Sequence, residues 1–185
     1  MAAIFAVVGS KRSGKTTTVE ALTRELTARG YTVAGIKHVS EADFTLDTKG
    51  KDTWKYAQSG AKTIIAVSSN EIVTIEKLKT TCLSLSEILT RAEGSDVVFT
   101  EGFRKYVSKE RSIYKIVVVK SAEEAREAIK TFSPILAFTG PYSTEELKLK
   151  TPYFGVLNDA SKLADLVENI IIEGRRHSKK KETAY

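Results

Sequence analysis

Short apolar runs alternate along this chain with segments in which apolar residues recur at helical spacing. The first run, Ile4–Val8, is apolar at every position, which is typical of a strand covered on both faces. In residues 15–29, Val19, Leu22 and Leu26 recur at a spacing that predicts an amphipathic helix. The alternation of the two patterns indicates an α/β fold with a mainly parallel sheet.

The rest of the chain continues this alternation. Further strands are expected at residues 32–37, 63–67, 71–75, 96–100, 114–119, 135–138 and 153–156, and helices at 52–58, 83–92, 122–130 and 160–172. The strands at 63–67 and 71–75 are separated only by Ser68, Ser69 and Asn70, which predicts an antiparallel hairpin at the edge of the sheet. Because no linker interrupts the pattern, residues 1–173 are expected to form one domain.

The distribution of charge separates the C-terminal end from the rest of the chain. Residues 174–185 contain five basic residues against one acidic residue, Glu182, in a chain of net charge +6. Such a run predicts a basic, disordered tail. The remaining body has no continuous basic stripe, so nucleic acid is not expected as its partner.

Composition also limits the compartment. Cys82 is the one cysteine, so an intramolecular disulfide is impossible, and a packed thiol is expected there. The N-terminus lacks the basic start of a signal peptide, and no apolar run approaches the ~20 residues that span a bilayer. We therefore expect a cytoplasmic protein without a membrane partner.

The strongest chemical signal lies between the first strand and the first helix. Residues 9–16, GSKRSGKT, match the phosphate-binding pattern G-x-x-x-x-G-K-[ST] in full. Glycines let the backbone approach phosphates, and successive N–H groups then face the anion at the helix N-terminus. We predict a P-loop NTPase three-layer sandwich whose nucleotide-binding residues are Gly9, Ser10, Lys11, Arg12, Ser13, Gly14, Lys15, Thr16 and Thr17.

Magnesium at such a loop needs the Thr16 hydroxyl and a carboxylate at a strand end. Glu101 ends the predicted strand at 96–100, at the edge of the sheet where open α/β folds bind ligands. Asp47 is the predicted second anchor, within a D-x-x-G sequence, and Asp52 is the alternative. His38 is interpreted as structural, because no histidine or cysteine cluster has zinc-binding spacing.

Two further stretches have a more specific order of residues. The first runs through Gly35-Ile36-Lys37-His38, Asp43-Phe44, Asp47-Thr48, Gly50-Lys51-Asp52 and Ser59-Gly60-Ala61, and the second is Thr100-Glu101-Gly102-Phe103-Arg104. On these residues the chain resembles, over residues 1–173, the MobB family of molybdopterin-guanine dinucleotide biosynthesis proteins.

The resemblance implies weak GTP binding with Mg²⁺, low GTPase activity and a homodimer, often formed by extending sheets. It also implies an accessory role to a MobA-like nucleotidyltransferase, with molybdopterin as a further ligand. The chain departs from the family where Val39-Ser40-Glu41-Ala42 replaces additional histidines. It also lacks an N-K-x-D sequence, so the preference for guanine over adenine rests on the resemblance.

Other functions stay open on the sequence. Glu101-Gly102 is also similar to dethiobiotin synthetase, which would make the protein a P-loop small-molecule kinase or ATP-dependent ligase-like enzyme, with Arg104, Lys105, Lys109 and Arg111 as a substrate clamp. A nucleic-acid-associated NTPase would use the basic tail as an electrostatic arm. The segment 102–112 is interpreted as a loop that covers molybdopterin phosphate, contacts a partner or simply connects two strands.

Overall fold

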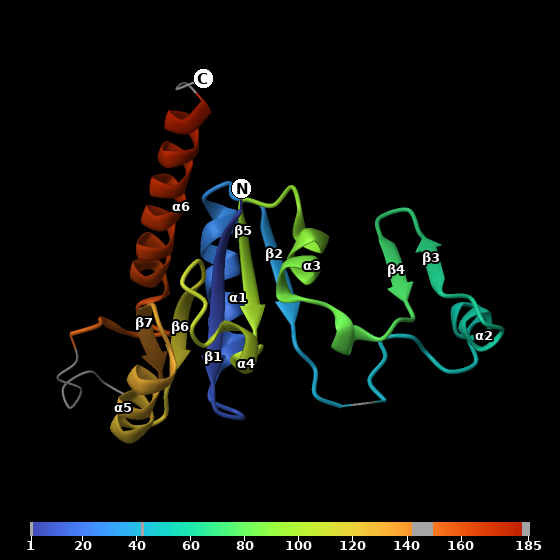
Figure 1. Ribbon diagram of the computed structural model, residues 1–185, viewed down its shortest axis with the longest axis horizontal. Coiled ribbons are helices and arrows are strands. Elements are labelled where there is room, and N and C mark those ends of the chain that lie inside the picture. The colour runs from blue at the N-terminus through green and yellow to red at the C-terminus, as the bar shows by residue number, and fades with distance from the viewer. Residues whose placement is uncertain (1, 42, 142–149, 183–185) are drawn as a thin grey trace. The chain divides into compact units, whose positions relative to one another are not determined.

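Six parallel strands form the main sheet. The computed structural model describes residues 2–41, 43–141 and 150–182. The strands are β1 (Ala3–Gly9), β2 (Val33–Lys37), β5 (Val97–Glu101), β6 (Tyr114–Val118), β7 (Ile135–Gly140) and β8 (Tyr153–Gly155). They lie in the order β2-β5-β1-β6-β7-β8, and every neighbouring pair is parallel (Figure 1). The predicted parallel sheet is confirmed, and β1 lies inside it, flanked by β5 and β6.

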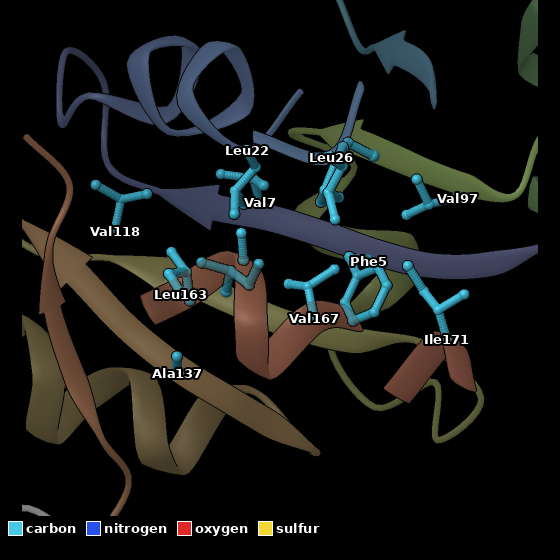
Figure 2. Close-up of a cluster of buried hydrophobic side chains, with 13 residues drawn as sticks. Phe5, Val7, Leu22, Leu26, Val97, Val118, Ala137, Leu163, Val167 and Ile171 are labelled. Carbon is cyan, nitrogen blue, oxygen red and sulfur yellow. The ribbon is translucent and has the colours of Figure 1, made fainter. Parts of the chain in front are cut away.

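One face of the sheet is covered by helices α1 (Lys15–Ala28) and α6 (Ala160–Glu182), which contact each other. Leu22 and Leu26 of α1 and Leu163 and Val167 of α6 are completely buried around Phe5 of β1 (Figure 2). These apolar positions recur every three or four residues, as expected for a helix with one buried face. The core therefore fixes α1, whose first residues belong to the phosphate-binding pattern, against β1.

Helices α4 (Arg104–Val107) and α5 (Ala122–Thr131) lie on the other side of the sheet from α1 (Figure 1). Val117 and Val118 of β6 and the following Val119 line one cavity with Ala128 of α5 and Phe132, the residue after α5. The Ser121 hydroxyl accepts a hydrogen bond from the Glu124 N–H at 3.2 Å and so caps α5. Helices on both faces of a mostly parallel sheet confirm the predicted α/β three-layer fold.

Residues Val39–Ile88 form a second compact unit, separate from the unit made by Met1–His38 and Leu89–Tyr185. It contains α2 (Asp52–Gln58) and the antiparallel strands β3 (Thr63–Val67) and β4 (Ile72–Glu76). The predicted hairpin is confirmed, but it forms a sheet of its own instead of an edge of the main sheet. The sequence predicts one domain over residues 1–173, because no linker-like composition marks the boundary between the two units.

The helix expected at 83–92 is shorter and irregular. It consists of α3 (Leu85–Leu89), followed by a 3₁₀ turn (Thr90–Ala92) and preceded by another (Thr80–Cys82). The Ser84 N–H donates to the Glu87 carboxylate at 2.7 Å and the Glu87 N–H to the Ser84 hydroxyl at 3.2 Å, a capping box that starts α3 at Leu85. Cys82, expected as a packed thiol, is exposed on the preceding 3₁₀ turn.

Helix α6 continues to Glu182, so residues 174–182 are helical where the sequence analysis expects a disordered tail. Arg175 lies over the Tyr31 ring, 5.4 Å from its centroid, and forms an ion pair with Asp96. Because Lys and Arg are good helix formers, a helix anchored by Leu163 and Val167 continues through this basic run at low cost. Within the described ranges, no helix combines the length and the apolar character needed to cross a bilayer.

Candidate phosphate-binding site

The phosphate-binding pattern forms a loop between the end of β1 and the start of α1. Arg12 and Gly14 have positive φ angles of 57° and 101°, so the backbone turns back on itself before the helix begins. The hydroxyls of Ser10 and Ser13 are buried and have no hydrogen-bond partner among the described residues. Buried donors without partners are costly unless a ligand meets them, so they fit an anion held inside this loop.

Gly9 shows why the loop needs a glycine at its start. A Cβ atom built on Gly9 would lie 2.4 Å from the carbonyl oxygen of Val118 and 2.7 Å from the Ser13 hydroxyl. Both distances are too short for any side chain, and the nearer atom belongs to the backbone of the neighbouring strand β6. The loop can therefore follow β6 closely only because position 9 carries no side chain.

The N-terminus of α1 has no capping side chain and no acidic residue of its own. Its N-cap residue, Gly14, offers no side-chain hydrogen bond, and the first turn contains no acidic residue. The first backbone N–H groups of a helix lack intrahelical partners and carry the positive end of the helix dipole. This end of α1 is therefore suited to bind phosphate.

Lys15 lies at the start of α1 and reaches back over the loop. Its ammonium donates to the Ser10 carbonyl at 2.7 Å, which holds the side chain across the turn. Burial lowers the pKa of Lys15, the Glu101 carboxylate opposes that shift, and the charges of Lys37 and Lys120 add to it. The loop thus carries a local excess of positive charge that a phosphate group would neutralise.

Thr16 and Glu101 are brought together by the sheet. The Thr16 hydroxyl lies 3.1 Å from each carboxylate oxygen of Glu101, and the ammonium of Lys37 lies 3.3 Å from Glu101 Oε1. Glu101 ends β5, where it is in register with Val7 of β1 and Lys37 of β2. Parallel strands place their carboxyl ends at one edge, so these groups converge beside the phosphate loop.

The turn after Glu101 is tight. Gly102 has a φ of 91°, and a Cβ atom there would lie 3.2 Å from the Cβ of His38. The His38 N–H donates to the Glu101 carbonyl at 2.9 Å, and the His38 ring packs against Phe103 with centroids 5.2 Å apart. His38 therefore has structural contacts, in agreement with its interpretation from the sequence.

A hydroxyl and one carboxylate fit Mg²⁺ at a phosphate loop, because Mg²⁺ usually takes one or two protein oxygens together with substrate phosphates and water. Thr16 and Glu101 carry two oxygens of this kind, and their assignment as metal ligands stays a prediction. Within the described part of the chain, no group of three or more histidine, cysteine or acidic side chains could hold a metal ion by itself. A metal at this site would thus depend on the nucleotide for its remaining ligands.

Asp47 and Asp52 belong to the other unit. Asp47 Oδ1 accepts hydrogen bonds from the Thr48 N–H at 2.9 Å and the Thr53 hydroxyl at 2.8 Å, so it organises the turn before α2. Asp52 is exposed and pairs with Lys55 at 3.1 Å. Their assignment as the second metal anchor stays a prediction.

The outer residues of the loop make fewer contacts. Lys11, Arg12 and Thr17 are exposed, and their part in nucleotide binding stays a prediction. Lys37 also lies at this site, although no sequence motif marks it. Its position at the end of β2 becomes informative only once β2 is known to pair with β5, the strand that carries Glu101.

The segment 102–112 is more ordered than the loop expected from sequence. It contains α4, and Phe103 and Val107 are buried. Arg104 lies over the Phe132 ring, 5.1 Å from its centroid, and lines a cavity of about 110 Å³ together with Gly9 and Ser10. Of the predicted substrate clamp, Arg104 is therefore the residue that shares a cavity with the phosphate loop.

Comparisons with known proteins give a consistent result. Residues 4–140 match the model of the family described as molybdopterin guanine dinucleotide synthesis protein B, MobB. The chain is 27% identical over 168 residues to the molybdopterin-guanine dinucleotide biosynthesis adapter protein of Haemophilus influenzae, covering 90% of this chain and 88% of that protein. A Methanocaldococcus jannaschii protein provisionally given the same name is 32% identical over 123 residues, 65% of this chain. That match spans about half, 48%, of the archaeal protein.

Solved structures agree with the fold. A crystal structure of molybdopterin-guanine biosynthesis protein B has a TM-score of 0.68 and 25% identity, covering 91% of this chain and 98% of that chain. Bacillus subtilis MobB has a TM-score of 0.70 over 90% of this chain and 96% of that chain. At 22% identity, the Bacillus match supports the fold alone.

Proposed function

Because the chain belongs to the molybdopterin guanine dinucleotide synthesis protein B (MobB) family, we propose that it is a GTP-binding adapter in the biosynthesis of that form of the molybdenum cofactor. The relative in Haemophilus influenzae carries the name of such an adapter and is matched over 88% of its length. The partner in this role is a MobA-like nucleotidyltransferase, with molybdopterin as a second ligand.

The observation that carries the nucleotide part of the proposal is the hydrogen-bonded pair of Thr16 and Glu101 beside an uncapped helix N-terminus. An uncapped N-terminus binds phosphate, and a hydroxyl beside a carboxylate binds Mg²⁺. In this proposal Gly9–Thr17 hold the phosphates, Lys15 contacts their oxygens, and Thr16 and Glu101 hold the metal. Guanine preference comes from the family and not from an identified base contact.

Hydrolysis of GTP by this site is proposed to be slow. The Glu101 carboxylate is engaged by Thr16 and Lys37, so it is placed to hold a cation and not to activate water. The His38 ring makes a T-shaped contact with Phe103, with ring centroids 5.2 Å apart, and is assigned no catalytic role in this proposal. Mg²⁺ would supply charge stabilisation at the phosphates, while the chain contributes binding and orientation.

A homodimer is the proposed assembly, and the hairpin is its proposed contact surface. One face of the β3–β4 hairpin carries Ile65, Val67 and Ile72, whose exposed fractions are 61%, 73% and 69%. Three large apolar side chains on one face of a two-stranded sheet are unusual for a surface exposed to water. In the proposed homodimer, a second copy of the chain would cover this face.

Calorimetric titration with GTP and ATP, each with Mg²⁺, tests the proposal. We expect tighter binding of GTP, followed by association with a MobA-like nucleotidyltransferase in a pull-down with purified proteins. Equal or tighter binding of ATP would contradict the assignment of guanine. Absence of binding to both nucleotides would contradict the nucleotide-binding role itself.

A second candidate function is a small-molecule kinase or ATP-dependent ligase-like enzyme. It is favoured by the cavity that Arg104 shares with Gly9 and Ser10, because an acceptor bound there would lie beside the phosphate loop. The test is nucleotide turnover with a panel of small acceptors. Phosphate release that stays equally slow across the panel would exclude this candidate.

A further inference from the structure

Lys37 lies outside the phosphate-binding pattern, yet its ammonium reaches the same site. The residue ends β2 and is in register with Glu101 at the end of β5. Its ammonium lies 3.3 Å from Glu101 Oε1, and 57% of the Lys37 side chain is exposed. A half-exposed ammonium beside a carboxylate gains little stability from the pair, so the contact contributes little to the fold.

We propose that Lys37 is a specificity-determining residue that binds the terminal phosphate of a nucleoside triphosphate and thereby distinguishes triphosphate from diphosphate. The inference rests on the proposed nucleotide-binding function of the loop. Lys15 and the backbone donors at the start of α1 hold the phosphates that both nucleotides share. Lys37 approaches from the neighbouring strand end, on the side of Glu101.

The charges at the site explain how Lys37 becomes available. Glu101 is shared by the Thr16 hydroxyl and the Lys37 ammonium. A Mg²⁺ ion held by Thr16 and Glu101 would engage part of the Glu101 charge. Lys37 then faces a weaker acidic partner, and a terminal phosphate oxygen provides the charge that its ammonium requires.

A diphosphate cannot replace this partner, because it lacks the outermost phosphoryl group. Binding of a diphosphate would therefore leave the Lys37 ammonium with Glu101 and water. The affinities for triphosphate and diphosphate are therefore expected to differ by the one ion pair that Lys37 forms, while the contacts of the phosphate-binding loop are the same for both nucleotides. Charge-assisted hydrogen bonds of this kind correspond to about a 10-fold to 100-fold change in affinity.

Lys120 provides the matched control. Its charge also lowers the pKa of Lys15, so it lies in the same electrostatic environment. However, Lys120 follows β6, and its ammonium lies 3.9 Å from a different carboxylate, that of Glu124 on α5. Removing the Lys120 charge should weaken triphosphate and diphosphate binding to a similar extent.

The experiment is calorimetric titration of the full chain with GTP, GDP, ATP and ADP, each with Mg²⁺. In Lys37→Gln we expect triphosphate affinity to fall about 10-fold or more while diphosphate affinity changes less than about twofold. Lys37→Arg, which keeps the charge, should restore most of the triphosphate preference. Thermal unfolding of the same samples verifies that each variant is folded.

An equal loss for triphosphate and diphosphate in Lys37→Gln, or no loss for either, would overturn the inference while the proposed function stood. Wild-type protein that binds no nucleotide would overturn both. Preference for ATP would contradict only the guanine assignment, because Lys37 would still be tested by the ATP and ADP pair.

Discussion

The Thr16 hydroxyl donates to the Glu101 carboxylate, with both carboxylate oxygens at 3.1 Å, across 85 positions of the sequence. The contact joins the first turn of α1 to the carboxyl end of β5. Two oxygen-bearing side chains from separate elements are thereby held together. Such preorganisation would lower the cost of the Mg²⁺ and nucleotide binding proposed for this edge of the sheet.

Glu101→Gln should remove the benefit of Mg²⁺ for nucleotide binding. The amide keeps the shape of the side chain and can still accept from Thr16, but it lacks the negative charge that attracts the cation. We expect Mg²⁺ to improve nucleotide affinity about 10-fold less than in wild type. Titrations with and without Mg²⁺ measure this effect, and the exposed Glu93→Gln is the control. An unchanged Mg²⁺ dependence would exclude Glu101 as a metal-holding residue.

Lys15→Ala should lower nucleotide affinity about 10-fold to 100-fold and leave the fold intact, because the side chain contributes a charge-assisted contact to phosphate. The bond lost from the ligand-free protein is the one to the Ser10 carbonyl. Arg24→Ala removes an exposed charge from α1 outside the phosphate-binding loop and serves as the control. Nucleotide affinity equal to wild type in Lys15→Ala would refute the assignment of this loop.

The sequence predicts the phosphate loop and Glu101 because each signal is local: a complete motif between two elements, and an acid at the end of an apolar strand. Lys37 escapes prediction because its contact with Glu101 depends on the pairing of β2 with β5, strands separated by the whole second unit. Similarly, the composition of the basic run after Ile172 predicts disorder. The contacts of Arg175 with Tyr31 and Asp96 are known only from the three-dimensional structure.

Ile65→Lys should weaken self-association of the chain. A charge placed on the exposed apolar face of the hairpin would have to be buried against the second copy, and burial of an unpaired ammonium is costly. We expect the apparent dimer to shift towards monomer in sedimentation velocity measurements at micromolar concentration. Ile129→Lys, a half-exposed isoleucine on α5, is the matched control. Dimers that persist in Ile65→Lys, or a wild-type monomer, would contradict the proposed contact surface.

Lys115 offers a test of how the segment after Glu101 is held. Its side chain is completely buried inside β6, and its ammonium donates to the carbonyls of Ile113 and Ser133, each at 2.7 Å, and of Glu110. The lysine therefore ties the end of segment 102–112 to the residues before β7. Lys115→Met leaves these carbonyls without this donor, and each buried acceptor that loses its partner costs about 1–3 kcal/mol of unfolding free energy.

The pH dependence of that cost has a definite sign. Burial lowers the pKa of Lys115 from 10.5 to about 8; the charge of Glu110 opposes this shift and that of Lys109 adds to it. In the unfolded chain the ordinary pKa applies, so between about pH 8 and 10.5 the unfolded state binds more protons than the folded state. Raising the pH through this window should therefore stabilise the wild type relative to Lys115→Met. Urea unfolding of both proteins at pH 7.5 and about pH 9.5 measures the difference. The difference in unfolding free energy between wild type and Lys115→Met should widen as the pH rises. If it stays constant or narrows, Lys115 keeps its proton at least as readily in the folded protein as in the unfolded chain.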